Sequence, residues 1–573
     1  MSSRRTFLRQ MLSAPAGLAL TTGAGAALAG PARPAFAQDV PPPDGIWNLL
    51  QEQVPSYVQP GVPRGVQLSF ADDDLSRRAV TWLTSVEDPR SIVQWGVVGA
   101  TADTSELTAD DLTHVQDGSS ERAPFGDGAD STYLSAKRDN GPDVHHGERE
   151  VFVHRASLSG LQPGQRIAYR VGDGTRWSDI AITRGGPLAD EGFRFTHVGD
   201  HGPKLAAQRT TRALRRRQPD WHLFAGDLSY ANGDQRIWDL WAEQYSVMGR
   251  EVPTMVAPGN HESKDFMGQA YRTRFTQPRH GSSFYDWIHG NVFMISTAAG
   301  AFFGDEQGAM EDIRHELVWM EHTLARAAAL RAAGIIDFIV VTQHFPSYTD
   351  HRTRGPISPD RVVVAEQILQ RYQIDLLLVG HDHMYQRSHP MAYGLPTSTA
   401  GYTNTLAPVL GLEPTRPERY SNATGYIEVI AGSGGNGMYD FTEIDTLQLG
   451  VDPEMPLQRH LPWLAASARE LCFVEYDVRG PEMAVTGFVF DDGYDENRGD
   501  GIPDNEPGYN GDDPRFLADA DPEPFDTFTL VRKAYAEEVP TVPRLAAEIL
   551  RELPEAHGEL RYDVAEDCTT HDH

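Results

Sequence analysis

Between about residues 61 and 184, apolar and polar residues alternate in short segments separated by clusters of Gly, Pro and Asp. The alternating segments cover residues 66–70, 79–83, 92–96, 150–156 and 166–172. A period of two is typical of strands with one buried face, and repeated turn residues between short strands indicate a sandwich. We therefore predict an all-β domain over residues 61–187, after a Pro-rich linker over residues 38–60.

From residue 193 onward, the pattern changes to uninterrupted apolar runs. The runs cover residues 193–198, 221–225, 336–341 and 374–379. Such runs are typical of strands that are buried on both faces of a largely parallel sheet. Helices are predicted over residues 204–218 and 311–333, between these strands. Residues 190–490 are therefore predicted to form a second domain of the α/β class, with α and β layers.

Five short polar blocks contain seven potential metal ligands, and most of them follow an apolar run directly. The blocks are 199–202 (Gly-Asp-His-Gly), 226–230 (Gly-Asp-Leu-Ser-Tyr), 259–262 (Gly-Asn-His-Glu), 341–344 (Val-Thr-Gln-His) and 380–383 (Gly-His-Asp-His). Open α/β sheets place their binding sites just beyond strand ends, so these blocks are expected to converge.

The residue types in these blocks suit a site with two metal ions. Two cations about 3.5–4 Å apart need a bridging anion to offset their repulsion, and Asp227 is a natural bridge. Asp200 and Tyr230 are hard anionic oxygen ligands. Neutral donors come from Asn260, His344, His381 and His383. A phenol has a pKa of about 10, so Tyr230 favours a trivalent iron, which can hold it as phenolate.

The five blocks together resemble the signature of the purple acid phosphatases, within the metallophosphoesterase superfamily. Residues 380–387 and the glycine-rich turn at 432–436 are also similar to segments of that family. The resemblance implies a metallophosphoesterase-type catalytic domain behind a fibronectin III-like domain, as in the larger two-domain members. It implies that Asp200, Tyr230 and His383 hold Fe(3+), that Asn260, His344 and His381 hold a divalent ion, and that Asp227 bridges. The divalent ion is left open between Zn, Mn and Fe(2+).

The leading functional hypothesis is an acid phosphatase, a hydrolase of phosphomonoesters that uses a metal-bound hydroxide as nucleophile. A phosphodiesterase or nucleotide-cleaving enzyme of the same superfamily is the alternative. A non-catalytic phosphate-binding protein is a third hypothesis, against which the intact ligand set argues. The substrate and the oligomeric state are not determined by the sequence.

Three histidines outside the ligand set are candidates for protonating the leaving group. His261 follows the ligand Asn260 directly, and the family resemblance also assigns this residue to the phosphate or the leaving group. His351 lies seven residues after His344, although family members carry their histidine a little further along this loop. His201 is a third candidate, and Glu262 is predicted to brace His261.

The first residues contain two adjacent arginines, Arg4 and Arg5, followed by an apolar stretch and a small-x-small site at 35–37. This order is typical of a twin-arginine signal peptide over residues 1–37. It predicts export to the periplasm or beyond, in a bacterial or archaeal source, with no membrane-spanning segment after signal removal.

The formal net charge of the 573-residue chain is −31, so nucleic acid and anionic membranes are not expected partners. Residues 491–573 are predicted to be an acidic C-terminal extension. Residues 388–424 lack a helical period and are predicted to form a long loop that either covers the site as a lid or lies on the surface. Cys472 and Cys568 could pair, although Cys472 lies in a strand-like run where a buried thiol is the default.

Overall fold

A computed structural model of the chain describes seventeen stretches of it. They are residues 61–86, 90–123, 151–187, 191–232, 235–264, 268–278, 282–298, 309–351, 368–393, 406–408, 418–422, 425–439, 441, 463–491, 521–532, 541–552 and 563–564. The predicted signal peptide and linker, Cys568 and most of the acidic extension lie outside the described residues.

The first domain consists of two four-stranded antiparallel sheets. One has the order β1 (Arg64–Ser69), β2 (Arg78–Thr84), β6 (Phe152–Leu158) and β5 (Ser119–Arg122). The other has the order β4 (His114–Asp117), β3 (Ile92–Val97), β7 (Arg166–Gly172) and β8 (Ala181–Arg184). Two 3-10 turns, η1 (Thr104–Glu106) and η2 (Ala109–Asp111), follow β3. Both sheets contribute to one apolar core, so the all-β prediction is confirmed.

The second domain contains a seven-stranded sheet, called the first sheet below. Its order is β11 (Thr254–Ala257), β10 (Trp221–Ala225), β9 (Phe193–Val198), β22 (Leu471–Arg479), β23 (Glu482–Phe490), β24 (Glu523–Val531) and β19 (Glu418–Ser421). The strands β9, β10 and β11 are parallel, whereas β22 and β23 run antiparallel to their neighbours. β24 comes from beyond residue 490, so this sheet extends into the region predicted to be an extension.

A second seven-stranded sheet, called the second sheet below, packs against the first. Its order is β12 (Tyr285–His289), β13 (Val292–Ser296), β14 (Phe338–Thr342), β15 (Leu376–Val379), β20 (Ile427–Ala431), β16 (Tyr385–Ser388) and β21 (Leu464–Ala468). The strands from β13 to β20 are parallel, and the others are antiparallel. The prediction of one largely parallel sheet is therefore wrong, because antiparallel strands from late in the chain complete two separate mixed sheets.

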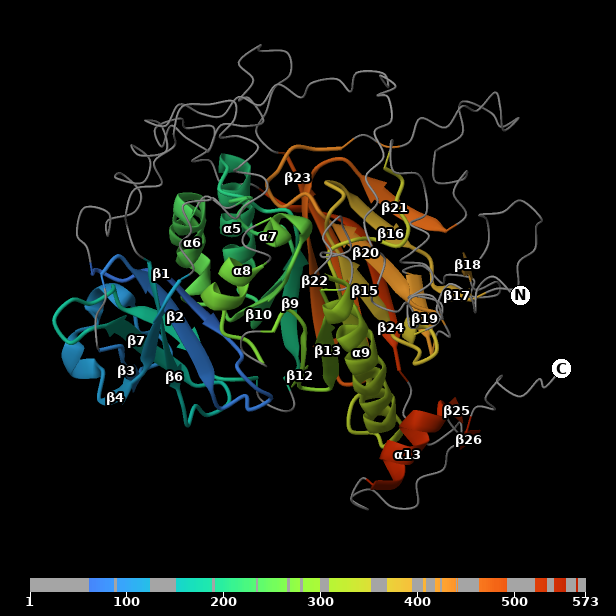
Figure 1. The fold of residues 1–573 in the computed structure, drawn as a ribbon, viewed down its shortest axis with the longest axis horizontal. Helices are drawn as coiled ribbons and strands as arrows, with labels where there is room; N and C mark the ends of the chain where they lie inside the picture. Colours follow the sequence, from blue (N-terminus) through green and yellow to red (C-terminus); the bar gives the residue numbers. More distant parts are fainter. Residues whose placement is uncertain are drawn as a thin grey trace, which may run out of the picture.

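Helices cover the outer faces of the two packed sheets (Figure 1). α5 (Leu205–Arg217) and α6 (Gln235–Gly249) lie on the first sheet, and α9 (Ala309–Ala332) lies on the second. The buried layer between the sheets is apolar and includes stacked rings of Phe195, Trp221 and Tyr476. This four-layer arrangement fixes the positions of the strand ends, and the predicted helices at 204–218 and 311–333 are confirmed within two residues.

The two domains are joined through α6. Arg64 of β1 forms a buried ion pair of 2.9 Å with Asp239 of α6, and the Gly65 N–H donates to Glu243 at 2.9 Å. Apolar side chains of both domains share one cluster at this joint, among them Leu83, Val153 and Trp241. The sandwich is thus packed directly against a helix of the second domain.

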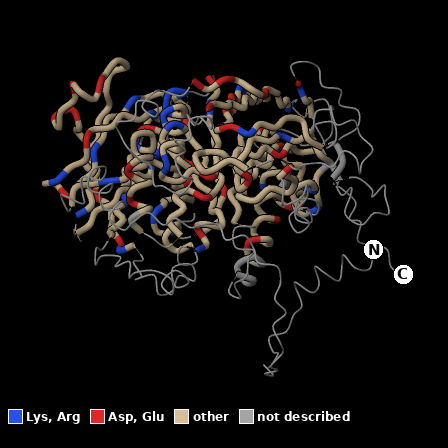
Figure 2. The backbone as a smooth tube through the Cα atoms, turned by 90° about the horizontal axis from the view of Figure 1, so that it is seen from above, with Lys and Arg blue, Asp and Glu red and all other residues tan. Residues whose placement is uncertain are grey.

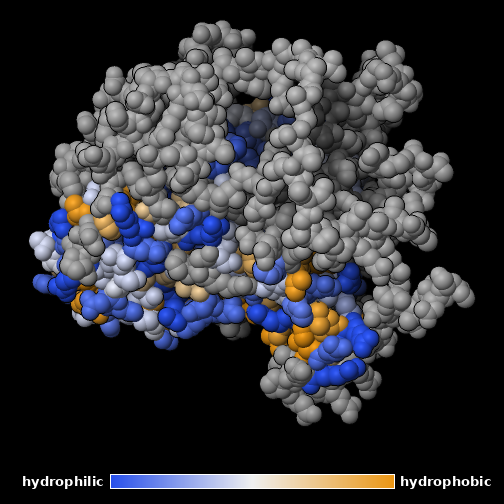
Figure 3. All heavy atoms as spheres, viewed as in Figure 1, coloured by the Kyte–Doolittle hydropathy of each residue, from blue (hydrophilic) through white to orange (hydrophobic). Residues whose placement is uncertain are grey.

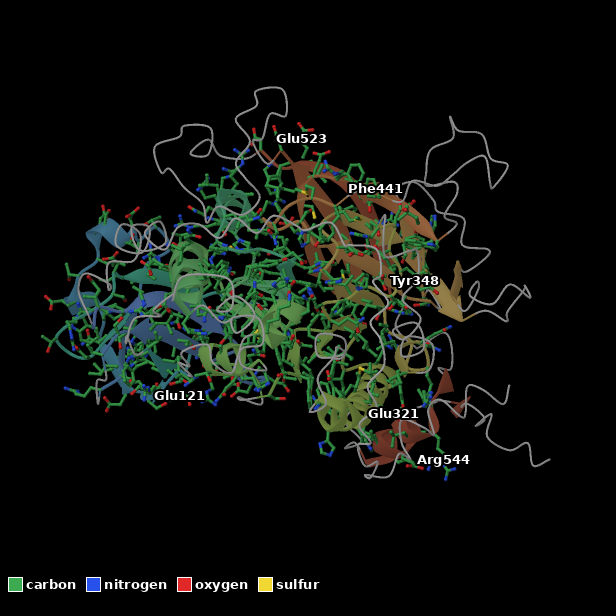
Figure 4. All side chains as sticks on the ribbon, turned by 45° about the horizontal axis from the view of Figure 1, so that its top comes forward. Glu121, Glu321, Tyr348, Phe441, Glu523 and Arg544 are labelled. Carbon is green, nitrogen blue, oxygen red and sulfur yellow. The ribbon has the colours of Figure 1, made fainter. Side chains whose placement is uncertain are left out.

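Shorter elements complete the description. They are α7 (Asn260–Ser263), α8 (Gln269–Arg274), β17 (Met391–Tyr393), β18 (Leu406–Pro408), β25 (Thr541–Val542), α13 (Arg544–Glu552) and β26 (Asp563–Val564). The strands β17, β18 and β19 fall within residues 388–424, the range predicted to form a long loop, and most of the rest of that range lies outside the described residues. Glu321 of α9 and Arg544 of α13, labelled in Figure 4, lie at the same end of the molecule.

Charged residues of both signs are interspersed along the described chain (Figure 2). On the face seen in Figure 3, apolar atoms reach the surface over α9 and α13, and Val318 of α9 is exposed. No helix in the described part of the chain is long and apolar enough to cross a membrane. Cys472 of β22 is buried, and its sulfur accepts a hydrogen bond from Ser433 Oγ at 3.1 Å.

Candidate metal centre

The seven predicted ligands all lie just beyond the carboxyl ends of strands that meet at one edge of the two packed sheets. In the first sheet, Asp200 follows β9, Asp227 and Tyr230 follow β10, and Asn260 follows β11. In the second sheet, His344 follows β14, and His381 and His383 follow β15. Contacts between these side chains sort them into two groups.

The tyrosine group consists of Asp200, Tyr230 and His383. The Tyr230 hydroxyl donates to Asp200 Oδ1 at 2.9 Å and lies 3.1 Å from His383 Nε2. His383 Nε2 is also 3.3 Å from Asp200 Oδ1. Three donor atoms from two sheets thus face one another.

The histidine-pair group consists of Asp227, Asn260, His344 and His381. His344 Nε2 is 3.2 Å from Asp227 Oδ2, 3.2 Å from Asn260 Oδ1 and 3.2 Å from His381 Nδ1. Donor atoms of Asp227, His344 and His381 all lie within 4.8 Å of one another, as around a metal ion. Metal–ligand bonds of about 2.0–2.2 Å bring neighbouring donor atoms to such separations.

The tautomers of two histidines are set by backbone carbonyl groups. His344 Nδ1 donates to the Ala225 carbonyl oxygen at 2.8 Å, and His383 Nδ1 donates to the Gly437 carbonyl oxygen. Each Nε2 therefore keeps its lone pair directed into the site, which is the arrangement that metal-binding imidazoles adopt. The donor set thus fits a pair of metal ions in both composition and orientation.

The carboxylates create a field that favours positive charge between the two groups. Burial alone would lower the pKa of His344, but Asp227 and Asp200 outweigh it and raise that pKa to about 9. Burial and the Asp200 carboxylate raise the pKa of Tyr230 well above its usual value. The phenol therefore ionises only if a strong cation is bound beside it.

Four of the ligands have left-handed backbone conformations, which non-glycine residues rarely adopt. Asp200, Asp227, Tyr230 and His381 have φ of 56°, 52°, 55° and 67°. Hydrogen bonds hold these turns in place, because the Asp200 N–H donates to the Gly226 carbonyl at 3.1 Å and the His381 N–H donates to Asp200 Oδ2 at 2.6 Å. The last contact links the two sheets directly.

The glycines that precede the ligands leave room for a ligand from another block. A Cβ on Gly226 would lie 2.5 Å from His344 Nδ1, and a Cβ on Gly380 would lie 2.6 Å from Asp200 Oδ2. Both distances are shorter than real side chains tolerate. The Gly-Asp and Gly-His pairs of the sequence are therefore required by the close approach of the two sheets.

Glu262 braces the backbone of two ligand blocks. Its carboxylate accepts hydrogen bonds from the N–H groups of Gly259, Asp227 and Leu228 at 2.7, 2.9 and 2.9 Å. We predicted that Glu262 would brace His261. Its hydrogen bonds hold the backbone of the turns that carry Asp227 and Asn260.

His261 lies at the edge of both ligand groups. Its ring is 4.3 Å from the Tyr230 ring, and its Nε2 is 3.8 Å from Asp227 Oδ2. Its Nδ1 donates to Asn232 Oδ1 at 2.6 Å, so Nε2 is the nitrogen that faces Asp227. The side chain is 22% exposed, which leaves it open to a substrate.

The other two candidate histidines are further from the ligands. The ring of His351 packs edge-on against Tyr439 at 4.7 Å, and Tyr439 is stacked on His383 at 4.0 Å. Tyr439 thus stands between His351 and the tyrosine group. His201 is buried, with its Nδ1 accepting from Trp241 and its Nε2 3.0 Å from Thr211 Oγ1, so it faces the helices α5 and α6.

The structure adds residues that the sequence analysis did not single out. Tyr439 covers His383, Asn232 orients His261, and Asn436 of the glycine-rich turn forms a hydrogen bond with Tyr230. Asn232 follows Tyr230 by two residues and Asn436 ends the noted turn, so their positions were visible in the sequence. Their roles depend on contacts across more than 25 residues of chain.

Comparison with known proteins agrees with this geometry. Residues 193–385 match the calcineurin-like phosphoesterase family, and residues 63–184 match the N-terminal domain of purple acid phosphatases. The human acid phosphatase type 7 is 27% identical over 305 residues, which cover 50% of this chain and 65% of that protein. Purple acid phosphatase 21 of Arabidopsis thaliana is 26% identical over 248 residues, covering 42% and 54%.

Among solved structures, a purple acid phosphatase from yellow lupin seeds has a similar fold. It superposes with a TM-score of 0.56 at 17% identity, covering 82% of this chain and 75% of that chain. By class, the second domain is a metallophosphoesterase. With its N-terminal domain it has the architecture of the purple acid phosphatases, which confirms the resemblance predicted from the sequence. The chain spans about 54–65% of the length of these two curated relatives.

Proposed function

We propose that the protein is a secreted acid phosphatase that hydrolyses phosphomonoesters with the help of two metal ions. The observation that carries the proposal is the convergence of all seven donor side chains, from two sheets, into two adjacent groups. Asp200, Tyr230 and His383 would hold Fe(3+). Asn260, His344 and His381 would hold Zn, Mn or Fe(2+), with Asp227 between them. When bound, the metal pair would supply a deprotonated water as nucleophile and offset the charge of the phosphoryl group.

The proton required by the leaving group is assigned to His261. Its Nδ1–H is held by Asn232, so the proton that it gives up is one that Nε2 has first taken up, on the side that faces Asp227. Burial lowers the pKa of His261 to about 4, so this protonated form is favoured by acidic pH. A leaving alkoxide is a strong base, and a donated proton lowers its energy in the transition state. His351 remains the second candidate, although the Tyr439 ring lies between it and His383.

The function is tested by comparing two chromogenic substrates with the same leaving group, a nitrophenyl monoester and a bis-nitrophenyl diester. We expect faster hydrolysis of the monoester, with a preference for acidic pH, and loss of activity on treatment with a chelator. Preference for the diester would favour the alternative, a phosphodiesterase. Activity on neither ester, with both metals present, would favour a phosphate-binding protein.

Export is proposed on the basis of residues 1–37, which lie outside the described residues. Fusion of these residues to a reporter should give export that depends on the twin-arginine pathway. Replacement of Arg4 and Arg5 by lysine should abolish that export, whereas export through the general secretory pathway would contradict the proposal.

A further inference from the structure

The chain uses lysine very sparingly. It contains 46 arginines and four lysines. Lys137 and Lys533 lie outside the described residues, whereas Lys204 and Lys264 both contact residues of the metal centre. An ammonium is a compact point charge, whereas a guanidinium is a broad planar fork. The two described lysines therefore both place a compact cation beside residues of the metal centre.

Lys264 lies beside His261. It follows α7 directly, is half-buried, and places its Nζ 3.4 Å from His261 Nε2. That His261 nitrogen is in turn 3.8 Å from Asp227 Oδ2. The ammonium thus lies beside the residue that we assign to the leaving group.

The contacts of Lys204 point to a different role. Its Nζ donates to Asn436 Oδ1 at 2.7 Å, a normal hydrogen-bond length, and Asn436 is bonded to Tyr230. Lys204 thus holds Asn436, the residue that forms a hydrogen bond with Tyr230. The contact between Lys264 and His261, at 3.4 Å, is longer and places the ammonium beside the residue assigned to the leaving group.

The charge of the substrate determines what such an ammonium does. A phosphomonoester carries about 1.5–2 negative charges near neutral pH, whereas a diester carries one. We infer that Lys264 is a specificity-determining residue that contacts the additional charged oxygen of a phosphomonoester and so favours monoesters over diesters. This inference rests on the proposed phosphatase function and names the substrate class of the same site.

The test uses the full-length, metal-loaded protein and the variants Lys264→Met and Lys264→Arg. The kcat and KM values for nitrophenyl phosphate and bis-nitrophenyl phosphate are measured, together with metal content and the calorimetric affinity for inorganic phosphate. Arg216→Met, at an exposed position of α5, is the control for loss of one surface cation. We expect Lys264→Met to raise KM for the monoester by about 10-fold to 100-fold, which is the effect of losing one charged hydrogen bond. KM for the diester should change by less than about threefold.

The affinity for inorganic phosphate should fall by a similar factor, with both metals still bound, and Lys264→Arg should recover part of the loss. An equal change for both esters, or an unchanged ratio, would overturn the role of Lys264 and leave the phosphatase function intact. If the wild-type protein hydrolyses neither ester, the proposed function is wrong. The phosphate affinity then still tests the lysine, and unchanged binding in Lys264→Met would overturn the inference.

Discussion

The two central sheets contribute different chemistry to the metal centre. The first sheet supplies oxygen donors only, and the second sheet supplies imidazole nitrogens only. The oxygen donors are Asp200, Asp227, Tyr230 and Asn260, and the nitrogen donors are His344, His381 and His383. Both groups of ligands combine donors from the two sheets, so neither sheet can form a metal site alone. The centre therefore forms only after the sheets have packed together.

The first sheet also contains histidines, but they are buried in its interior. His197 of β9 and His222 of β10 are 0% exposed. His222 Nδ1 is 2.8 Å from Thr196 Oγ1, and His197 Nε2 donates to the Val379 carbonyl at 3.2 Å. The two sheets thus differ in the residues that lie just beyond the carboxyl ends of their strands. The substitutions below test the consequences of that difference.

The largest effect is expected from Asp227→Asn, because Asp227 is the one oxygen ligand proposed to touch both metals. Loss of its charge leaves two cations insufficiently compensated. Activity should fall by more than about a thousandfold, beyond the cost typical of one charge-stabilising group. Kinetics combined with elemental analysis would check this.

Asp200→Asn is the matched comparison, since it removes the same charge from one group only, and its cost should be smaller. Substantial activity with both metals in Asp227→Asn would mean that the bridging assignment is wrong.

Two histidines lie in the turns after the strands of the first sheet, the buried His201 and the partly exposed His261. His261→Ala removes the exposed one. Both metals should stay bound, because His261 is outside the ligand set. Hydrolysis of esters with poor leaving groups should slow by about 10²–10⁴-fold, the usual value of general acid catalysis, and that of nitrophenyl esters much less. Rates across a series of leaving groups measure the difference.

Equal losses on both kinds of ester would show that His261 only positions phosphate, and would shift the acid role to His351. Loss of metal from the variant would show that the role of His261 is structural.

Among the oxygen donors of the first sheet, Tyr230 is the one that favours a trivalent ion, and Tyr230→Phe removes its hydroxyl. The purified protein is expected to be violet to pink from a phenolate-to-iron charge-transfer band, and the variant should be colourless. Absorption spectra with iron analysis test this. A colourless, iron-free and fully active wild-type protein would contradict the ferric assignment.

The smallest effect concerns a buried histidine that binds no metal. His289 of β12 lies among Phe70, Phe193 and Trp221. Neither of its ring nitrogens has a hydrogen-bond partner among the described residues. Burial, with the nearby Arg78, lowers the pKa of His289 to about 3.

Because the unfolded chain binds this proton near pH 6.5 and the folded protein does not, stability is lost as the pH falls below about 6.5. His289→Phe should remove this loss. Its gain in unfolding free energy over wild type should be about 2 kcal/mol larger at pH 5 than at pH 7. Urea unfolding at both pH values measures it, with the exposed His322→Phe as control. An equal shift at both pH values would contradict the expectation.

The convergence of the seven candidate ligands could be predicted from the sequence, because each block follows a strand or a buried apolar run directly and a local pattern identifies it. The two-sheet arrangement could not. β22 pairs with β23 and also with β9, which lies more than 270 residues earlier, and the sequence of β22 does not indicate that partner. The strand β24 lies after an acidic segment whose composition suggests an extension. Pairing over such distances depends on packing of the whole core.

The supporting residues were missed for a related reason. Tyr439 and Lys264 are ordinary residues in their local sequence, and their contacts with His383 and His261 appear only when the turns are folded. Glu262 was identified as a brace, but the backbone groups that it holds follow from the turn geometry.

The left-handed turns at Asp200, Asp227, Tyr230 and His381 set a trade-off between stability and activity. Each non-glycine residue in this conformation costs about 1–2 kcal/mol relative to glycine, so the ligands are held at the expense of the fold. Selection for thermal stability alone would therefore be expected to replace these residues with glycine. The resulting protein would have a larger free energy of unfolding but no metal site. Directed evolution of this protein needs an activity screen to retain its centre.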